Sequence, residues 1–138
     1  MDWSKRNTTI MAEFRANDGV VAEYDKLPII ILHTIGAKSG EVRETPLVAG
    51  IDEDGIHVFA SKAGAQTHPD WYYNLKAQPE IMVEYGSEKY RARLDQLDAE
   101  TAERKIVAMA EVLGQFAGYV EKASPRVIPA FSVTRLSD

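Results

Sequence analysis

Residues 33–46, HTIGAKSGEVRETP, decide the fold, because a buried strand opens there into a loop and then into a second strand. The apolar run at 28–32 comes just before this stretch and is typical of a strand that is buried on both faces. Val42, Thr45 and Pro46 favour a strand after the loop rather than a helix. We therefore expect two adjacent strands joined by a glycine-containing loop.

The loop itself has the composition of an anion site. Two glycines allow backbone N–H groups to turn toward a guest, two hydroxyls add donors, and two cations add charge. These residues are Gly36, Gly40, Thr34, Ser39, Lys38 and Arg43. A nucleotide P-loop is disfavoured because Ala37 stands before Lys38 where that motif needs glycine. The alternative is an ordinary hairpin whose Lys and Arg are solvated.

Composition limits the class of protein. The chain has 138 residues, 45% of them hydrophobic, which suits one domain over 1–138 with one core. A net charge of -5 opposes nonspecific binding to nucleic acid. The absence of cysteine leaves no disulfide or thiolate, as in reducing compartments. No segment resembles a signal peptide or the roughly 20-residue apolar run of a membrane span, so we expect a cytoplasmic protein.

The first eighteen residues predict a helix over 4–16, with Ser4 as its cap and apolar residues along one side. That side comprises Trp3, Ile10, Met11 and Phe14. Three roles stay open for this helix: packing on the domain, a lid over a ligand, or peripheral contact with a membrane surface. The three histidines, His33, His57 and His68, are too scattered in sequence to predict a metal site.

The rest of the chain alternates strands with two further helices. Asp98 is the expected N-cap of the longer helix, and a turn at 52–55 joins two strands as a hairpin. Expected strands are 28–34, 43–51, 56–61, 81–85, 89–94 and 130–136, and expected helices are 69–77 and 98–120. Antiparallel hairpins with inserted helices indicate an α+β domain with a small barrel core.

The chain resembles the deazaflavin-dependent nitroreductase family, which comprises oxidoreductases of chiefly actinobacterial origin that use coenzyme F-420. The likeness covers about 27–136 and depends on three segments in order. They are Gly36-Ala37-Lys38-Ser39-Gly40 with Arg43 and Pro46, then Ala60-Ser61-Lys62-Ala63-Gly64-Ala65, then Pro69-Asp70-Trp71-Tyr72-Tyr73-Asn74-Leu75. The resemblance implies a split β-barrel of the flavin-binding type.

The resemblance also implies which residues hold the coenzyme. Lys38, Ser39, Gly40 and Arg43 would bind its phosphate and acidic tail through charge-assisted hydrogen bonds. Segments around Ser61 and Trp71 would border the deazaflavin rings. The full implied set is Ala37, Lys38, Ser39, Gly40, Val42, Arg43, Pro46, Ala60, Ser61, Lys62, Asp70, Trp71, Tyr72 and Asn74.

The implied reaction is hydride transfer from the reduced deazaflavin to a small activated unsaturated, quinone or nitro substrate. Family members carry tyrosines near the substrate after the long helix, and Tyr119 is the matching residue here and the candidate proton donor. Phe116 cannot donate a proton, which makes nitroaromatic reduction the less favoured reaction.

Other functions remain open from the sequence. One is a protein that binds F-420 without turnover, as a carrier. Another is an FMN-dependent oxidase on the same barrel, similar to pyridoxamine phosphate oxidases. A third is a quinone reductase held at a membrane surface by its first helix. The chain could act as a monomer or as a homodimer.

Overall fold

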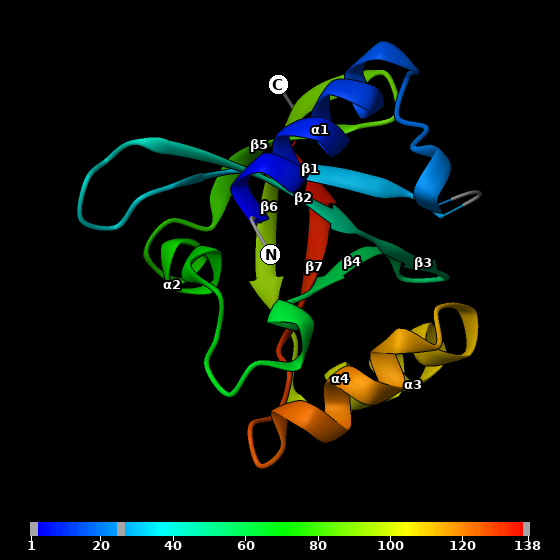
Figure 1. Cartoon of the computed structure of the whole chain (residues 1–138). Coiled ribbons are helices and arrows are strands. Elements are labelled where there is room, and N and C mark those ends of the chain that lie inside the picture. Colours follow the sequence, from blue (N-terminus) through cyan, green and yellow to red (C-terminus); the bar gives the residue numbers. More distant parts are fainter. Residues whose placement is uncertain (1–2, 25–26, 137–138) are drawn as a thin grey trace.

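The computed structural model describes residues 3–24 and 27–136. A curled antiparallel sheet of seven strands, in the order β2-β1-β5-β6-β7-β4-β3, forms the body of the molecule (Figure 1). Its strands are β1 Ile29–Ile35, β2 Val42–Val48, β3 Gly50–Asp52, β4 Gly55–Phe59, β5 Glu80–Tyr85, β6 Glu88–Gln96 and β7 Ala130–Arg135. The helices are α1 Trp3–Ala16, α2 Asp70–Ala77, α3 Ala99–Val112 and α4 Gln115–Ala123, with short 3-10 turns η1 Ala22–Tyr24 and η2 Lys62–Gly64.

The stretch around β1 behaves as its sequence indicates. Ile29, Ile30, Ile31 and Leu32 are each at most 2% exposed, because β2 and β5 flank β1 in the sheet and other elements cover both its faces. The register with β2 pairs Ile31 with Pro46 and closes the hairpin at Ile35 and Val42. The expected split-barrel α+β fold is confirmed.

Three apolar clusters hold the sheet and helices together. The largest fills the inside of the curl, where Trp71 and Leu75 of α2 pack against strand residues such as Leu32 and Val83. A second joins α3 and α4 to Phe59, and a third joins α1 to β1 through Phe14. Ile10, Met11 and Phe14 of α1 are buried in this way, so these three side chains are not free to face a membrane. Among the described residues, no helix is long and apolar enough to cross a bilayer.

The expected strand 43–51 is interrupted at Ala49. The Ala49 N–H donates to the Pro28 carbonyl at 2.9 Å, whereas the next residue, Gly50, already pairs with His57 of β4. The chain thus passes from one sheet edge, β2, to the other, β3. Gly50 permits this because a Cβ at that position would collide with the His57 ring.

The turn after β3 is the expected hairpin turn, and it is also bound to a helix. Lys105 of α3 is 9% exposed and donates to Asp52 at 2.6 Å and to Asp54 at 3.0 Å. These contacts fasten α3 to the β3–β4 turn.

The helix expected over 98–120 is two helices. Asp98 does cap it, accepting a hydrogen bond from the Thr101 N–H at 3.0 Å, but α3 ends at Val112 and Leu113 is extended. Gly114 then precedes α4, which runs on to Ala123. Glycine disfavours the helix interior, so the break falls where the sequence is weakest.

The other helix bounds differ only slightly from those expected. The helix expected over 69–77 is α2, for which Pro69 is the N-cap. The first helix begins at Trp3, which places Ser4 inside its first turn rather than at the cap. The Trp3 side chain lies outside the described part of the chain.

Candidate functional site

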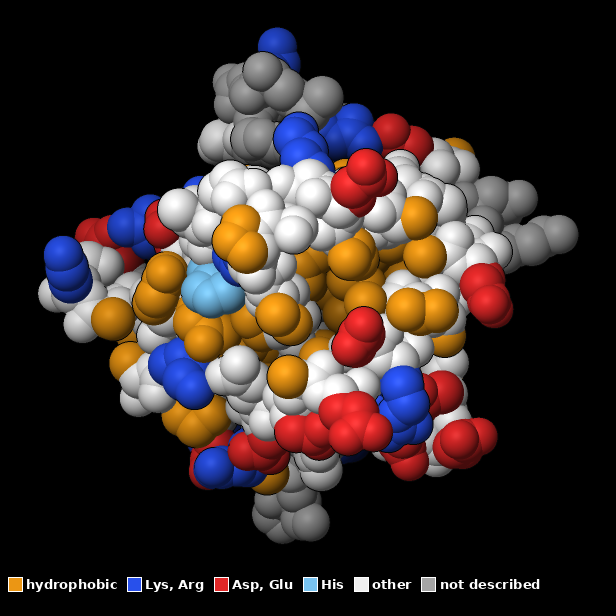
Figure 2. All heavy atoms as spheres, turned by 90° about the horizontal axis from the view of Figure 1, so that it is seen from below, with side chains coloured by type: hydrophobic (Ala, Val, Ile, Leu, Met, Phe, Trp, Pro, Cys, Tyr) orange, Lys and Arg blue, Asp and Glu red, His pale blue; other side chains and the backbone are white. Residues whose placement is uncertain are grey.

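A cavity of about 440 Å³ opens between the N-terminal elements, β2, η2, α2 and α4. This volume is in the range of small-molecule sites. Its walls are mostly apolar, with a few polar groups; they comprise Asn7, Tyr24, Thr45, Pro46, Leu47, Val48, Phe59, Ser61, Lys62, Ala63, Pro69, Asp70, Trp71, Gln115, Phe116 and Tyr119. On the face drawn in Figure 2, hydrophobic side chains gather in a central hollow, and charged side chains stand around it. A planar, partly apolar guest suits a cavity with this lining.

The η2 turn contributes the strained part of the wall. Lys62 and Ala63 both have left-handed backbones, with φ of 47° and 52°. Non-glycine residues adopt this conformation at a cost, and such strain is common at ligand sites. Lys62 donates to the Thr67 hydroxyl at 3.3 Å and is exposed at the cavity. The turn therefore presents a cation and backbone groups to a guest.

The Arg126 side chain holds this turn in place through hydrogen bonds to backbone carbonyls. Its guanidinium donates to the carbonyls of Ala60 at 3.0 Å, Ser61 at 2.8 Å and Ala65 at 2.9 Å. It also lies 2.9 Å from Nδ1 of His68, which must accept because arginine has only donors. Burial and the charge of Arg126 lower the pKa of His68, so this ring is held neutral. Four contacts from one side chain set the shape of the turn.

The α4 helix contributes a further wall of the cavity. Phe116 and Tyr119 both line it, and their rings lie 5.3 Å apart. Burial, and then the neighbouring Tyr24 phenol, raise the pKa of Tyr119, so it keeps its proton at neutral pH. A Cβ on Gly64 would come within 3.0 Å of the Tyr119 Cα, so η2 and α4 are in close contact. The position of Tyr119 thus depends on the turn.

The β1–β2 loop stands outside the cavity. Figure 1 shows it projecting from the body of the molecule. Lys38 is exposed, and Arg43, with a side chain 62% exposed, lies 4.0 Å from Glu41. The Ala37 N–H donates to Asn74 of α2 at 3.0 Å, which ties the loop to the helix. The loop's cations are available to an anion on the surface.

A family model described as F420H(2)-dependent quinone reductase matches residues 3–134. The chain belongs to this family. Coenzyme F420 is accordingly its cofactor, and the expected deazaflavin-dependent reductase is confirmed.

Relatives agree with the family assignment. The F420H(2)-dependent quinone reductase of Mycobacterium tuberculosis strain H37Rv is 31% identical over 111 residues, which cover 78% of this chain and 74% of that protein. A solved F420-H2 dependent reductase, FDR-A, is 34% identical, covering 78% of this chain and 94% of that one, with a TM-score of 0.65. A structure described as a domain-swapped dimer is 32% identical, covering 97% and 98% of the two chains, with a TM-score of 0.67.

A more distant structure shares only the fold. HutZ, described as the heme storage protein of Vibrio cholerae, is 16% identical with a TM-score of 0.59, covering 100% of this chain and 93% of that one.

The F420H(2)-dependent quinone reductase fold brings part of the predicted residue set together. Six of the predicted residues line the cavity: Pro46, Ser61, Lys62, Asp70, Trp71 and Tyr119. Six others belong to the projecting hairpin: Ala37, Lys38, Ser39, Gly40, Val42 and Arg43. Of the remaining three, Ala60 is buried, Tyr72 packs on His68 and Phe131, and Asn74 binds the hairpin. Their roles toward the coenzyme stay a prediction.

The cavity also contains residues that sequence reasoning missed. Asn7 and Tyr24 come from the N-terminal elements, and Gln115 begins α4. Phe59 and Val48 also line the cavity, whereas the sequence predicts them only as strand residues. Nothing in the local pattern of these residues distinguishes them, because only packing of distant segments places them at one cavity.

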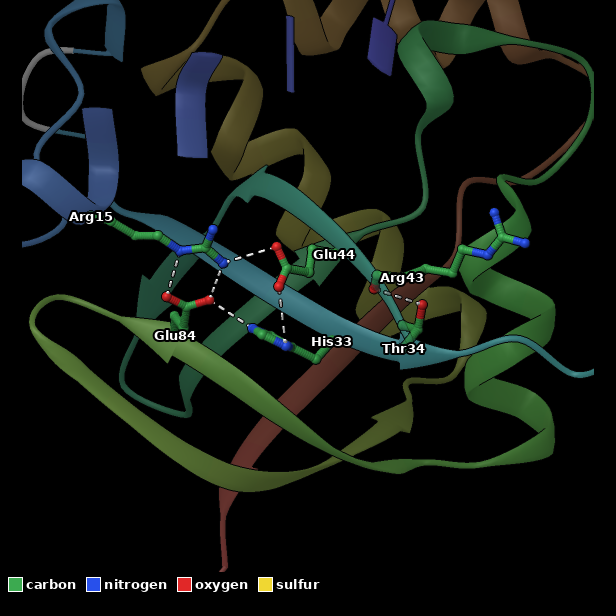
Figure 3. A network of polar contacts seen from close by, with 6 residues as sticks. All are labelled: Arg15, His33, Thr34, Arg43, Glu44 and Glu84. Carbon is green, nitrogen blue, oxygen red and sulfur yellow. Dashed lines mark hydrogen bonds and ion pairs between the residues drawn. The ribbon is translucent and has the colours of Figure 1, made fainter. Parts of the chain in front are cut away.

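A separate polar network lies on the outer side of β1 (Figure 3). Arg15 donates to Glu84 at 2.6 Å and to Glu44 at 3.0 Å, and His33 Nε2 lies 2.6 Å from Glu84. His33, Glu44 and Glu84 offer metal-ligating atoms within 4.8 Å of one another. Arg15 already bonds both carboxylates, so we interpret the network as an ion-pair cluster that fixes α1 to the sheet.

Proposed function

We propose that the cavity holds the deazaflavin ring and a quinone together, and that the chain catalyses reduction of the quinone by F420H(2). The observation that carries this proposal is the lining of the cavity. An apolar surface from Leu47, Val48 and Trp71 suits two flat rings, and a few polar groups at its edge can orient them. When bound, the reduced coenzyme supplies a hydride, and the quinone gains that hydride and one proton to become the hydroquinone.

Ser61 and Lys62 are the residues we assign to the polar edge of the ring. Both line the cavity, and the left-handed backbone at Lys62 and Ala63 turns the η2 segment toward it. Lys62 would place its positive charge at this edge of the ring. The deazaflavin has polar ring atoms for it to bind in both its oxidised and its reduced form. The walls contributed by Phe59 and Phe116 limit access of water to the reacting atoms.

The acidic tail of the coenzyme leaves the cavity and reaches the β1–β2 loop. Lys38, Ser39, Gly40 and Arg43 offer it two cations, a hydroxyl and a glycine backbone with φ of 72°. The bond from the Ala37 N–H to Asn74 holds this loop near α2, whose Asp70 and Trp71 line the cavity. The chain's net charge of -5 repels an anion at long range, so these local cations must supply the attraction for an anionic tail.

Tyr119 is the hydrogen-bond donor that we assign to the substrate. Its raised pKa keeps the phenol protonated, so it can donate to the oxygen on which negative charge develops. Phe116 beside it provides a surface for the quinone ring.

Oxidation of F420H(2) by menadione tests the function directly. Purified protein should restore the absorbance of oxidised F420 only when menadione is present, and FMNH2 should not replace F420H(2). A protein that binds F420 without menadione-dependent turnover would be a carrier. Turnover with FMN alone would indicate the oxidase alternative.

We also propose that the chain forms a homodimer. The supporting observation is the relative described as a domain-swapped dimer, which is 32% identical and matches 97% of this chain. Light scattering coupled to size exclusion should give twice the 15.4 kDa chain mass. A mass of one chain at micromolar concentration would contradict the dimer.

A further inference from the structure

We infer that Tyr24, oriented by Arg6, is a second phenol that binds the substrate in the cavity that Tyr119 also lines. This inference rests on the proposed quinone reductase function. Tyr24 comes from η1 and Tyr119 from α4, and both line the same cavity. Neither Tyr24 nor its partner Arg6 belongs to the sequence segments that carry the family resemblance.

Within the described part of the chain, the Tyr24 hydroxyl takes part in one hydrogen bond, which it accepts. Arg6 Nη2 donates to the Tyr24 hydroxyl at 2.9 Å, and the same nitrogen lies 2.7 Å from Glu23. Because arginine can only donate, the phenol oxygen accepts this bond and its own proton points elsewhere. Among the described residues, no acceptor for that proton is found. The proton is available to a guest in the cavity.

Packing holds the ring of Tyr24 at a place where the residue also lines the cavity. The ring packs at the edge of the α1 cluster formed by residues such as Ile10 and Phe14. Tyr24 and Arg6 also line a smaller adjoining hollow of about 100 Å³ between α1 and β2. Tyr24 thus stands on the boundary of two open spaces, where a donor with a fixed ring can be positioned precisely toward a substrate oxygen.

The Tyr24 phenol acts electrostatically on the Tyr119 phenol in the cavity that both residues line. After burial, the strongest influence that raises the pKa of Tyr119 is Tyr24, and Arg6 opposes it. A quinone carries two carbonyl oxygens on opposite sides of its ring, and hydride addition places negative charge on oxygen. Two phenol donors that come from different elements, η1 and α4, can each serve one of these two oxygens. Tyr24 would therefore contact the substrate directly, whereas Arg6 is a positioning residue that acts through it.

Tyr24→Phe tests the contact with little change in packing. We expect kcat/KM for menadione to fall at least about tenfold, because one donor to the developing charge is lost. The affinity for F420, measured by fluorescence titration, should stay within twofold. Tyr85→Phe, which removes a phenol from β5 outside the cavity, is the matched control and should keep the parent's kcat/KM.

The role of Arg6 is tested by a double-mutant cycle. Arg6→Ala should slow menadione reduction in the parent, but should cause no further loss in the Tyr24→Phe background, because Arg6 acts through the phenol. A purely structural Arg6 would give the same loss in both backgrounds.

The outcomes separate this inference from the proposed function. If the parent reduces menadione and Tyr24→Phe does so at the same kcat/KM, Tyr24 has no substrate role. A Tyr24→Phe variant that loses F420 affinity in proportion to its rate would also overturn the inference. Should the parent show no turnover, the proposed function fails, and menadione quenching of tryptophan fluorescence still decides on Tyr24: equal quinone affinity in parent and variant overturns its role.

Discussion

Lys62 is a cavity residue with an unfavourable backbone conformation and a charged side chain. Lys62 keeps a left-handed φ of 47° that a glycine would adopt at lower cost. The retained side chain supplies a cation at the cavity edge, and the bonds from Arg126 to neighbouring carbonyls hold the strained turn. In our proposal, the strained conformation of Lys62 costs stability and places its side chain where it would bind the coenzyme.

Lys38→Ala and Arg43→Ala should each weaken F420 binding about threefold to tenfold without changing the fold. Each removes one charge-assisted contact at an exposed position, where such a contact contributes on the order of 1 kcal/mol. A fluorescence titration measures the affinity, and Lys89→Ala on β6 is the matched control. Affinities equal to the parent's for both variants would remove the anion site from the β1–β2 loop.

Tyr119→Phe should slow menadione reduction about tenfold or more with near-normal F420 affinity. Its phenol lines the cavity, and the raised pKa keeps it a donor at neutral pH. Steady-state kinetics together with a coenzyme titration separate the two effects. Equal rates for variant and parent would leave Tyr119 with a packing role only.

At the scale of elements, the η2 turn and α4 form one unit, because Gly64 lies directly against the backbone of Tyr119. Gly64 has a φ of 82°, and a Cβ there would lie 3.0 Å from both the Cα and the carbonyl oxygen of Tyr119. No side chain suits both the space and the backbone. The contact explains how a turn after β4 can set the position of a helix near the end of the chain.

Gly64→Ala should lower the free energy of unfolding by about 1 to 3 kcal/mol and slow menadione reduction, because α4 must shift. Chemical denaturation and steady-state kinetics measure the two effects. Gly118→Ala is the control within α4: its Cβ would meet open space, and alanine favours the helix by about 1 kcal/mol. Equal stability of the two variants would mean that the η2–α4 contact is loose.

At the scale of the whole molecule, a carboxylate network makes the stability of the fold sensitive to acid. Hydrogen bonds from Arg15, and then from His33, hold the pKa of Glu84 at about 2, against burial that raises it. A depressed pKa stabilises the folded state above the ordinary value near 4.5, and this stabilisation is lost as the pH falls toward 2. The network connects α1, β1, β2 and β5, so its loss affects the sheet as a whole.

Glu84→Gln should remove about 2 kcal/mol of stability at pH 7 and flatten the loss of stability between about pH 5 and 2. Denaturation midpoints across this pH range measure both effects. Glu88→Gln, whose ion pair with Arg135 is exposed, is the matched control and should follow the parent. A Glu84→Gln variant with the parent's pH dependence would show that other carboxylates control acid unfolding.

Local patterns predicted most of the elements. They did not predict that the strand expected over 43–51 is interrupted at Ala49. The apolar run of β1, the Asp98 cap and the turn after β3 all follow from side-chain chemistry over a few residues. The interruption at Ala49 depends instead on which strand lies beside each residue, with Pro28 on one side and His57 on the other. Pairing partners so distant in sequence leave no periodic signal.

The sequence by itself determined the split-barrel fold, the family and its coenzyme, because strand periodicity and three ordered motifs are properties of contiguous residues. Only the tertiary structure decided which side chains share the cavity: it placed Tyr24 and Tyr119 on its walls and the Lys38 loop outside it. The physical reason is that a cavity is formed by packing between segments as far apart in sequence as Asn7 and Tyr119, and each contact depends on the shape of the whole sheet.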